Sequence, residues 1–351
     1  MTSAPGALNG AFDIYGGRGG VSRRAGELPD TELLHGEAGD YLAPDHVVEA
    51  VNVALHVGQP LLVTGDPGCG KTRLAWSVAK ELDLGPPLAF YTKSTSQAQD
   101  LLYAYDAVLR FHHIQGGNEK ERERAKDAAN YVRYHALGEA IVGRRDEVAA
   151  GGDGAAGAGG AGAGAARPGP SARRVVLIDE IDKAPRDFPN DLLNVLDKME
   201  FEVPELPVER RSQKAPPGAR PIVIITSNSE RQLPLPFLRR CVFLHIEFPG
   251  AGKLLEIVRQ RLPQVKLPDQ VIEVAIERFI EIRNVPALNK RPATGELLAW
   301  LVALHAGAAA AREEFRGKER GELPYLQVLL KDRHDWELVC GQRPETLKGG
   351  S

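Results

Sequence analysis

A glycine-rich octapeptide, Gly65–Thr72, lies between an apolar run and a segment with helical spacing. It reads Gly-Asp-Pro-Gly-Cys-Gly-Lys-Thr and fits the phosphate-loop pattern Gly-x-x-x-x-Gly-Lys-[Ser/Thr]. The apolar residues 60–64 predict a buried strand before it, and the spacing of residues 73–82 predicts an amphipathic helix after it. In this order, backbone amides and the positive end of the helix face an anion. The segment therefore predicts that the chain binds a nucleoside triphosphate.

A second apolar run, Val175–Ile178, ends in the acidic pair Asp179 and Glu180. Four consecutive apolar residues are typical of a central parallel strand buried on both faces, and ligands of such sheets gather at the carboxyl ends of the strands. We expect Lys71 to reach the β- and γ-phosphates, while Thr72 and Asp179 hold Mg²⁺. Glu180 is then placed to polarise the attacking water, which predicts hydrolysis.

A third strand is predicted over residues 220–228, where β-branched residues end in Thr-Ser-Asn. Asn228 can orient the water or contact the γ-phosphate. An arginine pair, Arg239 and Arg240, follows shortly afterwards. Two interpretations of the pair stay open: a solvated surface, or an arginine finger that stabilises the transition state on a neighbouring subunit's nucleotide.

With these four motifs in order, the chain resembles the AAA+ ATPases, and most closely their MoxR group, over about residues 41–335. The resemblance implies a P-loop AAA+ α/β fold, in which a central parallel sheet flanked by helices precedes a small all-α lid domain. It also implies that Asp179 and Glu180 form the Walker B pair and Asn228 is sensor 1. Arg240 matches the finger best and Arg239 is the second choice.

Nucleotide contacts are assigned to the loop, to the residue after it, and to a segment before the first helix that by resemblance faces the adenine. These residues are Gly65, Asp66, Pro67, Gly68, Cys69, Gly70, Lys71, Thr72, Arg73, Tyr41 and Leu42. For Tyr41, simple packing under the following helix is an equal alternative. ATP and Mg²⁺ are the implied ligands, but the preference for ATP over GTP comes from the resemblance alone.

The lid departs from the family pattern at one position. Many AAA+ proteins carry a sensor-2 arginine where this chain has Gly295. Arg291 or Lys290, in the preceding turn, can substitute for it. An exposed basic start to a helix is at least as good an interpretation of these two residues.

Composition excludes several other classes of protein. The formal charge of −3, from 44 basic and 47 acidic residues in a chain of 351, argues against a broad nucleic-acid surface. Three cysteines, two of them inside nucleotide motifs, argue against a disulfide framework and favour a reducing cytoplasm. No signal peptide and no apolar run of membrane-spanning length is present, so we expect no membrane association.

The pattern divides the chain into three parts. Residues 1–39 lack sustained periodicity and are expected to be a flexible lead-in, residues 40–248 the nucleotide-binding domain, and residues 249–351 the helical lid and tail. About eighty residues separate the strand at 88–92 from the Walker B strand, more than a crossover needs, which indicates an insertion at about 97–147. The Gly/Ala-rich stretch 149–172 is expected to be a disordered loop.

Within the insertion, residues 97–115 and 131–142 are predicted to be helical, and the mixed-charge residues 118–124 a solvated helix face or turn. By resemblance the insertion faces a ring pore, where Tyr103 and Tyr105 can grip a client, although tyrosines at this spacing are more often core. His112 and His113 have no partners at ligand spacing, so we expect no metal other than Mg²⁺. A short hairpin is predicted at residues 201–206, with Arg210, Arg211 and Lys214 in its polar loop.

The resemblance implies an ATP-hydrolysing homo-oligomeric ring, expected to be a hexamer. Such a ring remodels or activates a protein client, with a von Willebrand A domain protein as partner and a role in maturation or defence. Two other functions stay open. One is a nucleic-acid-associated motor, which the neutral charge disfavours, and the other is an ATP-gated switch or scaffold with slow turnover, which Gly295 leaves open. The client's identity cannot be read from these residues.

Overall fold

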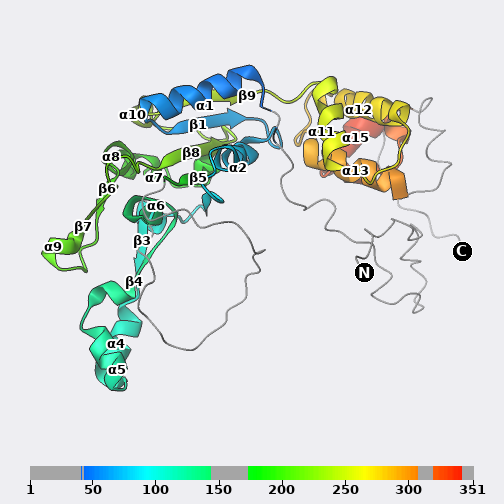
Figure 1. The fold of residues 1–351 in the computed structure, drawn as a ribbon. Helices are drawn as coiled ribbons and strands as arrows, with labels where there is room; N and C mark the ends of the chain where they lie inside the picture. The colour runs from blue at the N-terminus through cyan, green and yellow to red at the C-terminus, as the bar shows by residue number, and fades with distance from the viewer. Residues whose placement is uncertain (1–40, 42, 144–172, 307–318, 342–351) are drawn as a thin grey trace, which may run out of the picture. The chain divides into compact units, whose positions relative to one another are not determined.

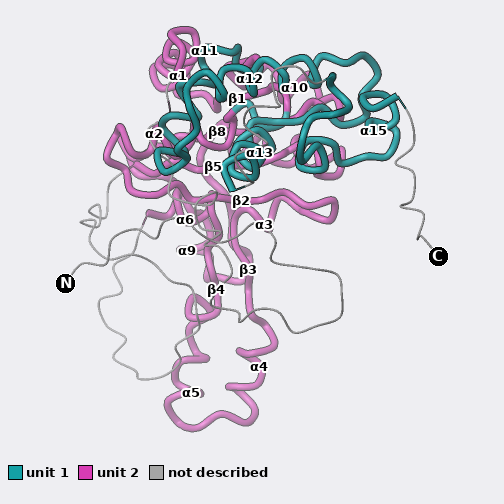
Figure 2. The backbone as a smooth tube through the Cα atoms, turned by 90° about the vertical axis from the view of Figure 1, so that its right-hand side faces the viewer, with its two compact units in different colours: residues 1–39, 67–69, 248–351 teal, residues 40–66, 70–247 magenta. Residues whose placement is uncertain are grey.

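The computed structural model describes residues 41, 43–143, 173–306 and 319–341. The chain divides into two compact units: residues 40–66 and 70–247 form unit 2, whereas unit 1 comprises residues 1–39, 67–69 and 248–351 (Figure 2). The predicted flexible lead-in at 1–39 and the Gly/Ala-rich loop at 149–172 lie outside the described residues.

Unit 2 is built on a five-stranded sheet with the strand order β2-β5-β8-β1-β9, in which every neighbouring pair is parallel (Figure 1). The strands are β1 (Leu61–Gly65), β2 (Leu88–Tyr91), β5 (Val175–Asp179), β8 (Ile222–Ser227) and β9 (Val242–Ile246). The three central strands are β5, β8 and β1, and the apolar runs predicted from the sequence lie on them. Those runs are buried because helices cover the sheet.

Helices pack directly on this sheet. α1 (Asp45–Val57) contacts β1 and β9, α2 (Lys71–Glu81) contacts β1, β5 and β8, and α6 (Ala136–Val142) contacts β2 and β5. The predicted central parallel sheet with flanking helices is therefore confirmed. Because all five strands run in the same direction, β1, β5 and β8 bring the glycine loop, the acidic pair and Asn228 to one edge.

The insertion between β2 and β5 differs from its predicted helical form. Two segments predicted to be helical instead form a β-ribbon, in which β3 (Tyr103–Tyr105) pairs antiparallel with β4 (Val132–Tyr134). Aromatic and β-branched residues favour this pairing, since each side chain meets a partner across the ribbon. The remaining elements are α3 (Ala98–Leu102), α4 (Ala107–Gly116), α5 (Glu119–Ala125) and the short helix η3 (Ala128–Tyr131).

We call residues 103–134 the arm, because the β3–β4 ribbon carries α4 and α5 at its end away from the sheet (Figures 1 and 2). The mixed-charge stretch predicted as a solvated helix or turn begins α5. Asn118 caps this helix: its side chain accepts a hydrogen bond from the amide of Glu121, whose carboxylate accepts one from the amide of Asn118. This reciprocal capping lets a short polar helix end the arm.

A second ribbon follows β5. After η4 (Ile181–Lys183), α7 (Phe188–Asp191) and α8 (Leu193–Lys198), β6 (Glu200–Glu202) pairs antiparallel with β7 (Ser212–Lys214). The returning strand thus lies later than predicted, since residues 203–206 leave the ribbon and bury Val203 and Leu206. Arg210 and Arg211 lie on the intervening α9 (Val208–Arg211), and Lys214 lies on β7. A short helix, α10 (Leu235–Leu238), precedes β9.

Unit 1 is all-helical over the described residues 248–306 and 319–341, as predicted for the lid. Its helices are α11 (Ala251–Arg261), α12 (Asp269–Arg283), α13 (Thr294–Ala306), η6 (Arg320–Glu322), η7 (Leu326–Val328) and α15 (Arg333–Cys340). Trp300 and Phe279 are fully buried in its separate apolar core. The guanidinium of Arg283 lies 3.6 Å from the ring centroid of Phe248 and stacks on that ring.

Candidate functional site

The glycine loop leads from β1 directly into the first turn of α2. Gly70 needs to be glycine for two reasons: its φ of 102° is left-handed, and a Cβ there would come within 2.9 Å of the Tyr41 ring. Tyr41 therefore packs against the loop's last glycine. Leu42, its predicted companion at the adenine, lies outside the described residues.

Lys71 is the first residue of α2, and its side chain turns back over the loop. The Lys71 ammonium donates hydrogen bonds to the backbone oxygens of Gly65 (2.7 Å) and Asp66 (3.0 Å), and the residue is buried. Asp66, Pro67 and Gly68 are exposed, whereas Cys69 is buried. Because the Lys71 ammonium is held against its own loop, its positive charge lies where the motif predicts phosphate.

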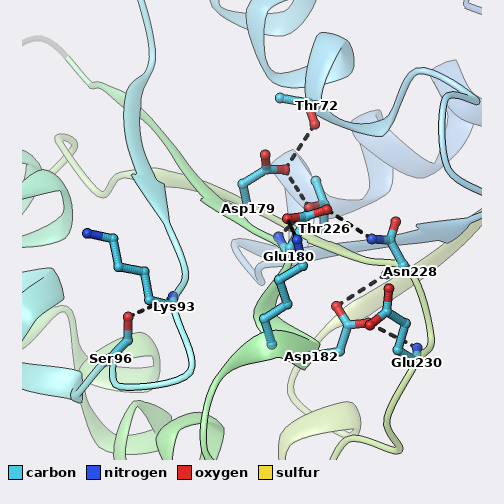
Figure 3. Close-up of polar contacts among 10 residues, drawn as sticks. Thr72, Lys93, Ser96, Asp179, Glu180, Asp182, Thr226, Asn228 and Glu230 are labelled. Atoms are coloured by element: carbon cyan, nitrogen blue, oxygen red, sulfur yellow. Dashed lines mark hydrogen bonds and ion pairs between the residues drawn. The ribbon is translucent and has the colours of Figure 1, made fainter. Parts of the chain in front are cut away.

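Asp179 lies at the carboxyl end of β5, between two hydroxyl donors (Figure 3). Its Oδ1 accepts hydrogen bonds from the hydroxyls of Thr72 (2.9 Å) and Thr226 (2.6 Å). The Thr72 hydroxyl and the Asp179 carboxylate are thus adjacent oxygen donors, the ligand type that Mg²⁺ prefers. These residues fit the predicted magnesium site. Arg73, the next residue of α2, is half-buried.

Glu180 follows Asp179 in an unusual backbone conformation. Its φ of 56° is left-handed, which costs energy for a residue with a side chain. The turn is held by the Glu180 amide, which donates to the Thr226 hydroxyl (2.8 Å). The Glu180 carboxylate accepts hydrogen bonds from the Asn228 side-chain amide at Oε1 (3.0 Å) and from the Lys183 ammonium at Oε2. The predicted Walker B glutamate and sensor 1 are therefore in direct contact (Figure 3).

Sequence reasoning missed three side chains of this network. Thr226 lies near the carboxyl end of β8 and links Asp179 to Glu180. Asp182 is buried and accepts the backbone amides of Asn228 and Glu230. Lys183 pairs with Glu180, which raises the pKa of Lys183. The available signal was a polar side chain at or just after the carboxyl end of a strand. The partners of Thr226 and Asp182 lie more than 40 residues away along the chain, so this signal did not identify them.

The two candidate finger residues differ in their surroundings. The Arg240 guanidinium donates to Asp197 Oδ2 (2.6 Å) and to the backbone oxygen of Pro236 (3.0 Å). Arg239 is exposed, and within the described part of the chain its side chain makes no hydrogen bond or ion pair. Cys241, which follows Arg240, is half-buried, and its burial raises the pKa of its thiol to about 12.

The sensor-2 candidates lie in unit 1. Lys290 and Arg291 are exposed in the turn before α13. The buried carboxylate of Asp335, on α15, accepts hydrogen bonds from the amides of Asn289 (2.6 Å) and Lys290 (2.9 Å) and so fixes this turn. Gly295 lies in the first turn of α13 with open space around its Cα.

The two tyrosines predicted to contact a client are structural in this conformation. Tyr103 is buried, stacks on Phe201 and donates its hydroxyl to Glu205 (3.1 Å), while the Tyr105 hydroxyl accepts from Arg110 (2.8 Å). The ribbon pairing turns the Tyr103 ring toward Phe201, which agrees with the alternative that this tyrosine belongs to the core. His113 likewise bonds to the Tyr131 hydroxyl (2.7 Å).

Two other features are absent from the described residues. In the part of the chain that the structure describes, no cluster of three or more histidine, cysteine, aspartate or glutamate side chains is suited to a metal ion. Among these residues, no helix is long and apolar enough to cross a membrane.

Comparison with known proteins identifies the family. A model of the AAA domain (dynein-related subfamily) matches residues 60–241, more than half of the chain. No curated protein matches. Among solved structures, NtrX from Brucella abortus has 14% sequence identity and a TM-score of 0.44, with 85% of this chain and 55% of that chain covered, so this chain spans little more than half of its length. On the family match, which includes the glycine loop, the acidic pair and Asn228, the chain belongs to the dynein-related subfamily of AAA domains.

Proposed function

We propose that this protein is a MoxR-like AAA+ ATPase that binds ATP with Mg²⁺ and hydrolyses it in a homo-oligomeric, hexameric ring. The work of the ring is to remodel or activate a protein partner of the von Willebrand A type. The observation that carries the enzymatic part is the contact between Glu180 and Asn228, beside the Thr72–Asp179 pair. AAA domains of this family generally hydrolyse ATP, and this chain retains the side chains for it.

The residues divide the chemistry as follows. Lys71 and the loop amides hold the β- and γ-phosphates, and Thr72 and Asp179 are the protein ligands for Mg²⁺. When bound, Mg²⁺ neutralises charge on the phosphates. Glu180 polarises the attacking water, and Asn228 holds the glutamate through Oε1. Because phosphoryl transfer depends mainly on positioning and charge stabilisation, a preformed Glu180–Asn228 pair is the arrangement that it needs.

Glu180→Gln tests this assignment. The amide cannot act as a base, so we expect kcat for ATP hydrolysis to fall by about 10²–10⁴-fold while ATP affinity is kept. Phosphate release and ATP binding are measured on the same preparations. Glu81→Gln is the matched control, because that exposed carboxylate lies at the far end of α2. Hydrolysis by Glu180→Gln at the wild-type rate would show that Glu180 is not the catalytic residue.

The ring proposal depends on an arginine that reaches a neighbouring subunit. The resemblance favours Arg240, but Arg240 is already paired with Asp197, whereas Arg239 is exposed. We therefore propose Arg239 as the finger, with Arg240 holding the turn that presents it. Removal of a finger costs about 10³–10⁵-fold in kcat. Arg239→Ala should assemble normally but lose activity, and Arg240→Ala should lose less.

Mixed rings test whether the finger acts between subunits. Glu180→Gln and Arg239→Ala are each inactive by this proposal, yet a ring containing both has some interfaces that combine an intact Glu180 with an intact Arg239. We expect activity to reappear on mixing, with native mass measured in parallel. Mixtures that stay inactive although they co-assemble would contradict a finger in trans.

The protein partner is supported only by the resemblance to MoxR-like proteins, as is a cytoplasmic location. Pull-down with von Willebrand A domain proteins encoded nearby, using the ATP-trapped Glu180→Gln ring as bait, tests it. Strong stimulation of ATPase activity by DNA and none by such a protein would favour a nucleic-acid motor instead.

A further inference from the structure

Asp182 is a buried acid with no part in the mechanism above. It lies on η4, two residues after Glu180, and is 2% exposed. Both of its carboxylate oxygens accept backbone hydrogen bonds, Oδ1 from the amide of Asn228 (3.2 Å) and Oδ2 from the amide of Glu230 (3.0 Å) (Figure 3). A buried carboxylate is retained only when such donors compensate its desolvation.

These two amides flank a strained residue. Ser229 has a φ of 60°, a left-handed conformation that is unfavourable for serine, and its own amide donates to the Ser227 hydroxyl (3.0 Å). Three consecutive amides after β8 are therefore held by side-chain oxygens, two of them by Asp182. Without these acceptors, no hydrogen bond would compensate the energy cost of the left-handed conformation at Ser229.

The turn matters because Asn228 is part of it. The Asn228 side chain donates to Glu180 Oε1, and Asp182 fixes the backbone from which that side chain extends. Asp182 and Glu180 belong to the same short segment after β5, while Asn228 directly follows β8. One buried carboxylate thus joins the ends of two neighbouring strands at the site.

Resting on the proposed function of Glu180 and Asn228, we infer that Asp182 is a positioning residue for hydrolysis. It sets the turn at residues 227–230 so that Asn228 holds the Glu180 carboxylate in place. It acts through Asn228 and does not contact the reacting atoms. This role predicts a loss in kcat with little change in nucleotide affinity, because the loop and the Mg²⁺ ligands are untouched.

Asp182→Asn and Asp182→Ala test the inference. The amide of asparagine keeps one acceptor but points a donor at the second backbone amide, and alanine removes both acceptors. We expect kcat to fall by up to about a hundredfold, since a small misplacement of a catalytic group has that effect, with KM within a factor of about three. Asp187→Asn removes an equivalent charge five residues later from an exposed position and should leave the wild-type kcat.

Two further measurements separate positioning from a general structural role. The double variant Asp182→Ala/Asn228→Ala should have a kcat close to that of Asn228→Ala alone, because both changes remove the hold of Asn228 on Glu180. Multiplicative losses, or a kcat unchanged in Asp182→Asn, would overturn the inference. If Asp182→Ala does not fold, the same cycle is run with Asp182→Asn.

Amide hydrogen exchange keeps the test independent of activity. In Asp182→Asn, the amides of Asn228 and Glu230 should exchange at least about tenfold faster than in the wild type, while amides of β1 keep their protection. If the wild type proves inactive, the proposed function fails but this readout still judges the turn. Unchanged exchange at both amides would refute the role of Asp182.

Discussion

The carboxyl edge of the sheet, where β1, β5 and β8 end, and the arm differ in which side chains they bury. At the edge, polar groups such as Asp182 and Thr226 are buried, and each is hydrogen-bonded. On the arm, α4 has no buried residue, and Val108 and Phe111 are 81% and 64% exposed. The edge thus has a buried network of hydrogen-bonded polar side chains, whereas the arm exposes apolar side chains to solvent.

The two regions also differ in what fixes them. The edge is held by parallel strands far apart in sequence, whereas the arm is a local ribbon braced by the β6–β7 hairpin and by the segment between its two strands. Tyr103 contacts Phe201 and Glu205, and Arg210 makes two hydrogen bonds to Asp127 (2.7 and 3.1 Å). We therefore expect changes at the edge to alter turnover, changes at the arm's base to alter stability, and changes on α4 to alter neither in the isolated protein.

Among substitutions at Thr226, Tyr103 and Phe111, the largest effect is expected at Thr226, which lies at the edge. Thr226→Val keeps the shape but leaves the Glu180 amide and Asp179 without their shared hydroxyl. We expect kcat to fall by about 10²-fold or more and the free energy of unfolding to fall by about 1–3 kcal/mol. Thr226→Ser restores the hydroxyl and should recover most activity. Steady-state ATPase activity and urea unfolding measure both. A fully active Thr226→Val would contradict the proposed difference between the edge and the arm, because turnover would then not depend on the buried hydrogen bonds at the edge.

An intermediate effect is expected at Tyr103, at the base of the arm. Tyr103→Phe removes the hydrogen bond to Glu205, so we expect a loss of about 1–2 kcal/mol in stability and unchanged basal ATPase activity. Turnover that falls as steeply as in Thr226→Val would mean that the arm's base and the edge are one functional region.

The same residue predicts a pH dependence. Burial, followed by the Glu205 hydrogen bond, raises the pKa of Tyr103 from 10.0 to about 12. The folded state therefore retains this proton more strongly than the unfolded state. The resulting stabilisation is complete below pH 10 and is lost as the pH rises toward 12. Unfolding followed from pH 9 to pH 12 should show a smaller alkaline loss for Tyr103→Phe than for the wild type.

The smallest effect is expected on α4. Phe111→Gln changes a side chain that is already exposed, so stability should move by no more than about 0.5 kcal/mol and basal ATPase activity should stay at the wild-type rate. Thermal unfolding and ATPase assays check this. A large loss of stability would show that the apolar face of α4 is covered within the protein, which would remove the contrast with the edge.

The sequence predicted the sheet well because its signals are local. Each central strand is a continuous apolar run, and each run is followed directly by its functional residue: the glycine loop, Asp179 and Glu180, or Asn228. The sequence-based prediction was wrong in the arm, where the strands Tyr103–Tyr105 and Val132–Tyr134 were predicted to be helical. Their spacing fits a helix as well as a strand. Only the pairing of Tyr103 with Tyr134 and of Tyr105 with Val132, which are 31 and 27 positions apart in the sequence, favours the strand.

By itself, the sequence determined the phosphate loop, the acidic pair, the parallel α/β class and the all-helical lid, because each depends on residue types at fixed short spacing. Only the tertiary structure decided that Thr226 bridges Asp179 and Glu180, that Asp182 holds the turn of Asn228, and that Arg240 is paired while Arg239 is exposed. These contacts join residues brought together by strand order and burial. A buried polar group is defined by the donor that reaches it, and that donor comes from another part of the chain.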